Sequence, residues 1–324
     1  MREITYAEAI REALREEMIK DPNVILMGED IAAYGGAFKV TDGFLKEFGP
    51  ERVRDTPISE AAIVGAAIGA SLMGLRPVAE IMYMDFLPIG LEQICNQAAK
   101  MRFMSGGQLR VPIVIRTQYS LGRAHGAQHS QYIPSWLLQV AGVKVALPST
   151  PYDAKGLLKT AMRDGNPVMY IESSLLYRVK GPVPEDEYTV PFGKTDVKRE
   201  GSHVTVVAIS RMVRESIAAA EILKEQGIEA EILDPRTIQP LDIETVVNSV
   251  KKTGHLAIAE DDSKTGGVGA EIAASIAERA IDYLDAPIVR IAAPDIPIPF
   301  SPTLEQEYMP DKEKIVEAVK SLLQ

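Results

Sequence analysis

The sequence is short of several residue types that would define particular classes of protein. Cys95 is the only cysteine among 324 residues, which excludes an internal disulfide bond and any metal cluster held by several cysteines. Lysine and arginine number 35 against 45 aspartates and glutamates, so the formal net charge is −10. A protein that binds duplex nucleic acid is expected to carry the opposite balance, because phosphate contacts supply most of its affinity. We therefore expect no nucleic acid partner, whereas a protein partner with a basic surface suits the charge.

Long hydrophobic runs are also missing. Residues 1–6 lack the apolar core of a signal peptide. The longest uncharged stretch that could be tested as a membrane span, residues 61–75, is too short to cross a bilayer and is rich in alanine and glycine. The sequence therefore predicts no membrane association and an intracellular, cytoplasmic protein.

The pattern that is present is typical of an α/β protein. Short apolar runs alternate with longer amphipathic segments, which favours parallel sheets flanked by helices. Thr5 and Glu8 predict a capping box at the start of a helix that ends near Ile19, and a further helix is expected over 91–103. The length favours two domains, and the charged, proline-punctuated residues 179–200 predict a connection between domains 1–178 and 201–324.

Nucleotide and metal motifs are weak. Residues 266–269 approach a dinucleotide-binding fingerprint, but Ile272 stands where its last glycine belongs, which favours a glycine-rich helix start without a ligand. His125 and His129 have the spacing of two zinc ligands on a helix, yet the glutamate of a zinc protease is missing and Gly126 weakens the helix. Taken alone, each of these two histidines is interpreted as structural, and so are His203 and His255. Cys95 is expected to be a small core residue.

A helix expected over 61–73 carries unusually small side chains. Gly65 and Gly69 share one face, where either another subunit or a neighbouring element of the same domain could approach closely. Ser59 is a candidate N-cap of this helix. Glu60 is an acid in its first turn, where it would complement the helix dipole, and that structural role alone would suffice.

Several segments, in order along nearly the whole chain, match one family. The matching segments are residues 24–30, 55–60, 74–77, 127–131, 148–156 and 239–242. On these segments the sequence resembles the β subunit of the thiamine-diphosphate-dependent first component of acetoin and 2-oxo acid (pyruvate-type) dehydrogenase complexes. The resemblance implies a transketolase-like pyrimidine-binding domain followed by a transketolase C-terminal domain, in an assembly of two α and two β chains.

The resemblance also implies roles for individual residues. Glu60 matches the carboxyl group that hydrogen-bonds the aminopyrimidine ring nitrogen of thiamine diphosphate, and Ile58 and Phe86 match residues at that ring. His129 matches a histidine that acts on the substrate oxygen or during acyl transfer to a lipoyl dithiolane. In the family the α subunit binds the diphosphate and Mg²⁺ through a Gly-Asp-Gly segment, which this sequence lacks. The chain is therefore expected to be active only with an α subunit.

The substrate is the least defined feature. Leu87, Pro88 and Ile89 follow Phe86, where pyruvate-type members often carry a glutamine, and residues 80–86 and 300–305 look more like acetoin dehydrogenase. We therefore expect cleavage of acetoin and transfer of the acetyl group to lipoamide of an acyltransferase core protein. Oxidative decarboxylation of pyruvate or branched-chain 2-oxo acids is the alternative.

Two rivals and several minor assignments complete the sequence-based expectations. Retention of Glu60 and His129 argues against a non-catalytic adaptor, and the missing fingerprint argues against a nicotinamide oxidoreductase. Because some family members hold K⁺, such an ion is expected near Asp164 and Asn166. His125 is a candidate pocket-lining residue. Pro235 stands where the family usually has a leucine, and we assign no effect to this difference.

Overall fold

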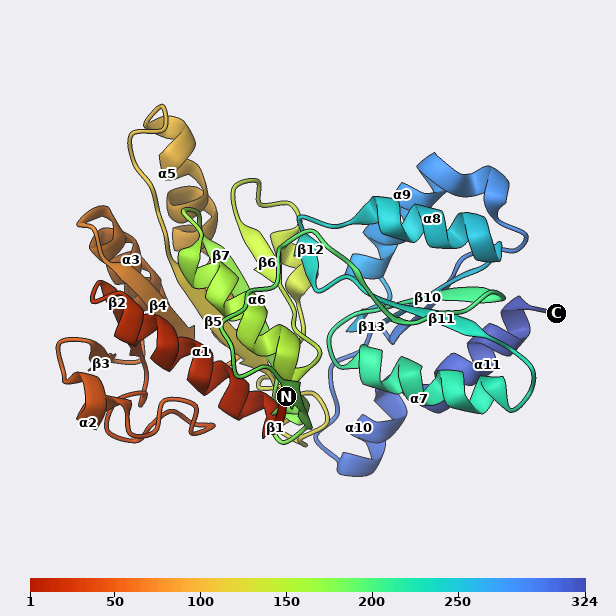
Figure 1. The fold of residues 1–324 in the computed structure, drawn as a ribbon, viewed down its shortest axis with the longest axis horizontal. Coiled ribbons are helices and arrows are strands. Elements are labelled where there is room, and N and C mark those ends of the chain that lie inside the picture. Colours follow the sequence, from red (N-terminus) through yellow and green to blue (C-terminus); the bar gives the residue numbers. More distant parts are fainter. The chain divides into compact units, whose positions relative to one another are not determined.

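The computed structural model describes residues 1–324 and contains two compact units (Figure 1). The first unit comprises Met1–Ser120 and Gln139–Phe192, and the second comprises Leu121–Leu138 and Gly193–Gln324. The 18 residues Leu121–Leu138 therefore belong to the second unit, although no sequence pattern indicated this. The last boundary between the two units lies inside the segment 179–200.

The first unit is built on a parallel sheet. Six of its strands follow the order β6-β7-β5-β4-β2-β3, and every neighbouring pair is parallel. The strands β2, β5 and β7 are buried at every residue, as expected for strands covered on both faces. The strands are β2 (Val24–Gly28), β3 (Val53–Asp55), β4 (Arg76–Ile81), β5 (Val114–Tyr119), β6 (Lys144–Ala146) and β7 (Val168–Ser173).

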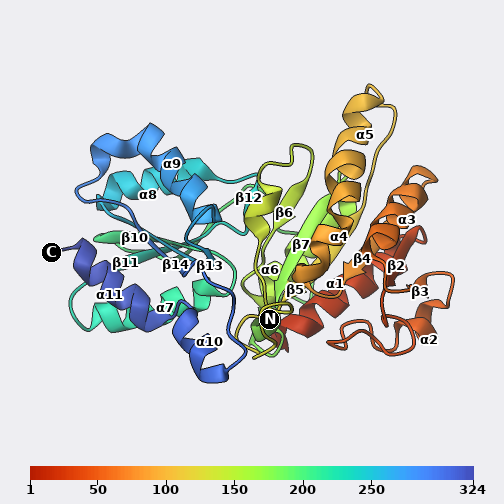
Figure 2. The same ribbon diagram turned by 180° about the vertical axis from the view of Figure 1, so that it is seen from behind.

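Helices cover both faces of this sheet. On one face of the sheet α1 and α6 pack against each other (Figure 1). The opposite face is covered by α4 and α5 (Figure 2). The predicted capping box is confirmed, since Thr5 and Glu8 exchange backbone–side-chain hydrogen bonds of 2.7 and 3.2 Å. The helices are α1 (Tyr6–Lys20), α2 (Phe44–Phe48), α3 (Glu60–Leu72), α4 (Leu87–Glu92), α5 (Ala99–Met104) and α6 (Pro151–Arg163).

The helix expected over 91–103 differs from the prediction. It begins earlier, at Leu87, and Gln93–Ala98 form a π-helical segment between α4 and α5. Cys95 lies in this segment and is half-buried rather than a core residue; burial raises the pKa of its thiol. A π-helical insertion of this kind has no local sequence signal, because it depends on what the helix packs against.

The second unit is a doubly wound domain. Its sheet follows the order β14-β13-β10-β11-β9, parallel except for β9, with α7 and α11 on one face and α8 and α9 on the other (Figures 1 and 2). Its elements are β9 (Asp196–Arg199), β10 (Val204–Ala208), α7 (Met212–Lys224), β11 (Ala230–Asp234), β12 (Thr237–Gln239), α8 (Ile243–Thr253), β13 (Leu256–Ser263), α9 (Val268–Ala280), β14 (Val289–Ala293), α10 (Pro302–Tyr308) and α11 (Lys312–Leu322).

The segment 179–200 carries structure of its own. Within it, β8 (Lys180–Val183) pairs with β1 (Arg2–Thr5) in the first unit, and β9 forms the edge of the second sheet. No helix is long and apolar enough to cross a membrane.

Candidate active site

Several carboxylates gather at the carboxyl end of the first sheet. Glu29 directly follows β2, and in the strand register Gly28 lies opposite Asp55 of β3 on one side and Glu80 of β4 on the other. Five residues after Asp55 the chain reaches Glu60, the first residue of α3. Ligands of parallel α/β sheets bind outside the carboxyl ends of the strands, so this edge is the place where the fold favours a site.

Glu60 is a buried carboxylate without a partner in the chain. It is 4% exposed, and its side chain makes no hydrogen bond or ion pair. Ser59 occupies the predicted N-cap position of α3, but its side chain makes no capping hydrogen bond. Burial of an uncompensated charge is costly, which indicates that Glu60 is kept for a group the chain does not supply.

A glycine brings the start of α4 against the start of α3. A Cβ atom at Gly90 would lie 3.2 Å from Val64 Cγ2, a tight contact, and 3.4 Å from the main-chain oxygen of Glu60. Phe86, which directly precedes α4, is half-buried and contacts Tyr83 edge to face at 5.8 Å. The residue pair predicted for the pyrimidine ring, Phe86 and Glu60, therefore belongs to two helix starts that pack together.

Ile58 adds an apolar surface next to Glu60. It is 82% exposed, although it is a large aliphatic residue only two positions before a buried carboxylate. Exposed apolar side chains that flank a polar group are typical of binding sites. The geometry of Ile58 suits contact with a ring or with another chain.

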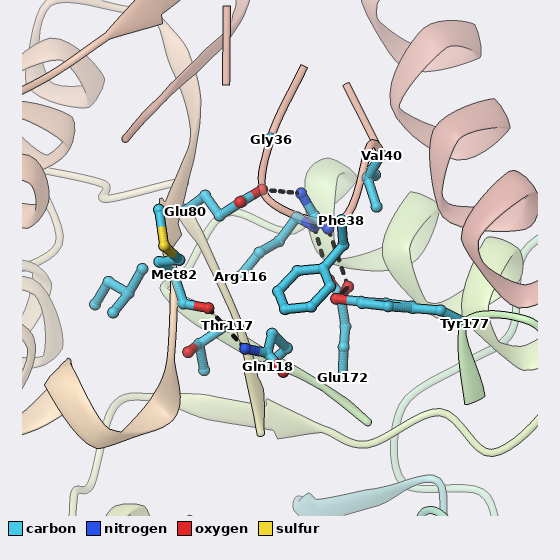
Figure 3. Close-up of a pocket in the computed structure, with 11 residues that line it drawn as sticks. Gly36, Phe38, Val40, Glu80, Met82, Arg116, Thr117, Gln118, Glu172 and Tyr177 are labelled. Carbon is cyan, nitrogen blue, oxygen red and sulfur yellow. Dashed lines mark hydrogen bonds and ion pairs between the residues drawn. The ribbon is translucent and has the colours of Figure 1, made fainter. Parts of the chain in front are cut away.

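An ion cluster lies beneath this edge of the sheet (Figure 3). The Arg116 guanidinium donates to Glu80 at 2.7 Å and to both oxygens of Glu172 at 2.8 and 3.0 Å, and the Tyr177 hydroxyl donates to Glu172 at 2.8 Å. Burial raises the pKa of Glu172. The cavity between these side chains measures about 10 Å³, room for about one water molecule, so the cluster is packed interior rather than a ligand pocket.

Glu29 is a site residue that sequence reasoning missed. It is 8% exposed, and its Oε1 atom is buried without a hydrogen-bond partner. Burial raises the pKa of Glu29, and the negative charges of Glu60, Asp30 and Glu80 raise it further. The sequence did place Glu29 directly after a buried strand and within the motif 24–30. Its raised pKa, however, depends on burial and on carboxylates from other elements.

The two candidate histidines lie in the other unit. His125 and His129 belong to Leu121–Leu138 and are both exposed, whereas Glu60 lies in the first unit. The segment that carries them is not helical, since Gly126 has a φ of +75° and Ala124 a φ of +56°, so their spacing does not place them on one helix face. No cluster of three or more histidine, cysteine, aspartate or glutamate side chains has the arrangement of a metal site.

A cavity of about 230 Å³ borders the same segment within the second unit. Its walls combine apolar side chains with a carboxylate, an amide, a hydroxyl and two phenol groups, a mixture that suits a small-molecule site. The lining residues are Leu121, Ala127, Gln131, Tyr132, Ile133, Asp261, Ser263, Ile296, Pro297, Ile298 and Tyr308.

The glycine-rich start of α9 is filled by a carboxylate of the chain itself. Both oxygens of Glu260 accept the Gly269 N–H, at 2.9 and 3.0 Å, and Glu260 is completely buried. Burial raises the pKa of Glu260 to about 8. A Cβ atom at Gly269 would lie 2.5 Å from Glu260 Oε1. The glycines thus make room for this side chain, where a dinucleotide site would hold phosphate.

The expected potassium ligands are engaged by cationic side chains. The Asp164 carboxylate pairs with Lys144 and accepts the Asn166 side-chain N–H at 2.7 Å. Its main-chain oxygen accepts from Arg76 at 3.1 Å, and Asn166 Oδ1 accepts from Arg102 at 2.7 Å. These oxygen atoms do not fit a K⁺ site, because three positive groups already occupy them.

The remaining sequence candidates have structural surroundings. A Cβ atom at Gly65 would lie 3.5 Å from Gln93, whereas nothing lies within 4 Å of the corresponding point at Gly69, so only the first faces a neighbour within the unit. His203 Nδ1 accepts the Glu229 N–H at 2.8 Å, and His255 Nδ1 lies 3.0 Å from the Thr253 oxygen. Both histidines hold loops in place, as predicted.

Comparison with known proteins places the whole chain in one group. Residues 2–180 match the transketolase pyrimidine-binding domain, and residues 193–315 match the transketolase C-terminal domain. The chain also resembles the solved structure titled "Split gene transketolase, inactive beta4 tetramer", with a TM-score of 0.81 and 25% identity over 99% of this chain and 98% of the other.

Curated relatives agree over the full length. The β subunit of acetoin:2,6-dichlorophenolindophenol oxidoreductase from Bacillus subtilis is 46% identical over 99% of this chain and 98% of its own. The 2-oxoisovalerate dehydrogenase β subunit of the same organism is 44% identical, with 98% of each chain covered. The pyruvate dehydrogenase E1 component β subunit of Rickettsia felis is 45% identical, over 99% of this chain and 98% of the relative. The chain belongs to the family of β subunits of thiamine-diphosphate-dependent acetoin and 2-oxo acid dehydrogenases.

Proposed function

We propose that this chain, together with an α chain, cleaves acetoin and passes the acetyl group to lipoamide of an acyltransferase core protein. The observation that carries the proposal is Glu60, a buried carboxylate that no group of the chain meets, at the edge of a parallel sheet where ligands bind. Ile58 and Phe86 supply apolar contacts near it.

These residues fit the pyrimidine half of thiamine diphosphate. When bound, the cofactor supplies the carbanion and the electron sink. The role of Glu60 is to hydrogen-bond a weakly basic ring nitrogen and to share a proton with it. Glu29 lies at the same edge of the sheet, and it has a raised pKa and a buried oxygen atom without a hydrogen-bond partner.

His129 is assigned a later proton transfer, at the substrate oxygen or during acylation of the lipoyl dithiolane. Its exposure suits a group that must meet a substrate carried by another protein, and the neighbouring 230 Å³ cavity has both apolar and polar side chains in its walls. His125, exposed in the same segment, is assigned only to the lining of the site.

The phosphate and metal half of the cofactor site is assigned to the α chain. This sequence has no Gly-Asp-Gly segment, and its glycine-rich helix start is filled by Glu260. Mg²⁺ therefore belongs with the α chain, in an assembly of two α and two β chains with residues 1–178 and 201–324 as the two domains. Potassium has no part in this proposal, since the oxygen atoms around Asp164 already accept from cationic side chains.

The choice of acetoin rests on few residues. Leu87, Pro88 and Ile89 begin α4 directly after Phe86, with Leu87 buried and the other two exposed. Relatives named for acetoin, 2-oxoisovalerate and pyruvate share 46, 44 and 45% identity with this chain, so overall similarity does not separate the substrates. Pyruvate or a branched-chain 2-oxo acid is the second candidate.

Reconstitution with the cognate α chain, Mg²⁺ and thiamine diphosphate tests the proposal. Acetoin, pyruvate and a branched-chain 2-oxo acid are compared with 2,6-dichlorophenolindophenol as electron acceptor, and each chain alone is the control. We expect turnover only with both chains and fastest with acetoin. A faster reaction with a 2-oxo acid would overturn the substrate and leave the role of Glu60. A well-formed complex without turnover on any of them would favour the adaptor.

A further inference from the structure

We propose that Glu305 is a positioning residue, which holds the segment carrying His129 in the conformation that acyl transfer requires. The inference deepens the proposed function, because it depends on His129 taking part in transfer to the lipoyl group. It concerns only the second unit, which contains both Glu305 and Leu121–Leu138.

The Glu305 carboxylate is bound by the backbone of that segment. Its Oε1 accepts the Gly122 N–H at 2.9 Å, and its Oε2 accepts the Ala124 N–H at 2.7 Å. Glu305 is 2% exposed and has no cationic partner, so these two amides are all that compensates its buried charge. Hydrogen bonds to a buried carboxylate are among the stronger ones in proteins, and this pair joins residues 181 and 183 positions apart.

The segment needs such support because its backbone is unusual. Gly122, Ala124 and Gly126 all lie in the left-handed region, with φ values of +89°, +56° and +75°. Residues other than glycine rarely adopt this conformation, so Ala124 is intrinsically unfavourable there. Backbone N–H groups that converge in a turn of this kind create an anion-binding concavity, and here those of Gly122 and Ala124 converge on one carboxylate. Glu305 fills that concavity from α10.

A second contact fixes the same segment from the residues before α10. A Cβ atom at Gly126 would lie 3.1 Å from the Phe300 ring, so the ring covers the glycine closely although Phe300 is 73% exposed. The stretch 300–305 therefore contacts the segment at Gly126 and at the two amides. His129 follows three residues after Gly126, whose oxygen accepts the His129 N–H at 3.3 Å.

The test replaces Glu305 by glutamine in the reconstituted complex. Glutamine keeps the shape of the side chain, but its NH₂ group cannot accept a hydrogen bond, so one of the two amides loses its acceptor. We expect hydrogen exchange at Gly122 and Ala124 to accelerate, and acylation of a lipoyl domain to fall about tenfold, the factor that one charge-assisted hydrogen bond corresponds to. Reduction of the artificial acceptor is expected to fall much less.

Glu307→Gln is the matched control, since Glu307 is exposed in the same helix α10 and its carboxylate has no partner. It should leave both readouts unchanged. Glu305→Asp keeps both acceptor oxygens on a shorter arm and should lie between wild type and Glu305→Gln; if the glutamine variant does not fold, this variant decides in the same assays.

A double variant separates positioning from general destabilisation. If Glu305 acts through His129, adding Glu305→Gln to His129→Ala should not slow lipoyl acylation further. Multiplying losses, or equal losses in dye reduction and acylation, would overturn the proposal. If His129→Ala alone has no effect, the role of His129 in the proposed function fails, while exchange at Gly122 and Ala124 still reports whether Glu305 holds the segment.

Discussion

Two regions of the first unit bury charge in opposite ways. Between α1 and α6, Lys155 and Lys159 are buried, and both meet the Glu16 carboxylate, at 2.5 and 2.7 Å. At the carboxyl end of the sheet, Arg116 pairs with Glu80 and Glu172 while other carboxylates nearby have no counterion. The first region is balanced, and the second holds more negative than positive groups.

The difference separates a structural role from a functional one. The partners between the helices reach solvent, since the Glu16 side chain is 38% exposed and that of Glu12 24%, so water shares their charge. The Glu172 side chain is 1% exposed and depends entirely on Arg116 and Tyr177. A buried site with more negative than positive groups lowers the stability of the folded chain. Such a site is expected where a bound ligand supplies the missing partner of the charges.

The largest effect is expected from Arg116→Met. Removing the guanidinium leaves Glu172 and Glu80 without their cation in a dry place, and breaking a buried ion pair in this way costs about 3–5 kcal/mol. Denaturant unfolding of the chain measures the loss. A loss below 1 kcal/mol would mean that water enters and solvates the cluster, contrary to its cavity of about 10 Å³.

Glu60→Gln should affect activity rather than stability. Turnover in the reconstituted complex is expected to fall roughly 10²-fold or more, about 2.7 kcal/mol of barrier, because the amide cannot share a proton with the pyrimidine ring. The free energy of unfolding should stay the same or rise, since the variant no longer buries an unpartnered charge. Glu3→Gln, at an exposed position without ion pairs, is the control. Near-normal turnover would remove Glu60 from the mechanism.

A smaller loss is expected for Lys155→Met. Lys155 is as buried as Arg116, but Glu12 and Glu16 can turn to water once the ammonium group is gone, and methionine retains most of the packing volume. We expect a loss of about 1–2 kcal/mol in denaturant unfolding, clearly below that of Arg116→Met. Equal losses for the two variants would show that exposure of the partner carboxylates does not decide the cost.

The fold was predictable where its signals are local. Thr5 and Glu8 defined the start of α1, and the alternation of short apolar runs with amphipathic segments indicated parallel sheets flanked by helices. The passage of Leu121–Leu138 into the second unit was not predictable, because it depends on contacts such as that of Glu305 with Gly122, 183 residues apart. The π-helical residues 93–98 also lack a local signal.

The site was reached by resemblance rather than by the residues alone. The pattern around Glu60 favoured an ordinary first-turn acid of a helix, and only the family motif assigned it to the cofactor. Glu29 lay inside a quoted motif and was still missed. Its properties arise from burial and from the charges of Glu60 and Glu80, which the sheet brings together.

The smallest expected effect is a pH dependence of stability caused by Glu29, one of the carboxylates without a counterion at the carboxyl end of the sheet. The pKa of Glu29 is raised, so the folded chain holds this proton at a pH where the unfolded chain has released it. The contribution of Glu29 to stability is therefore fully present below its ordinary pKa of about 4.5 and is lost as the pH rises through the raised value.

Glu29→Gln removes that dependence, so its free energy of unfolding relative to wild type should increase between pH 4 and pH 8, whereas that of Glu3→Gln should stay level. In the background of Glu60→Gln the increase should shrink, because the charge of Glu60 is the second cause of the raised pKa after burial. An unchanged increase would mean that Glu60 does not contribute to the raised pKa of Glu29, which burial, Asp30 and Glu80 would then set.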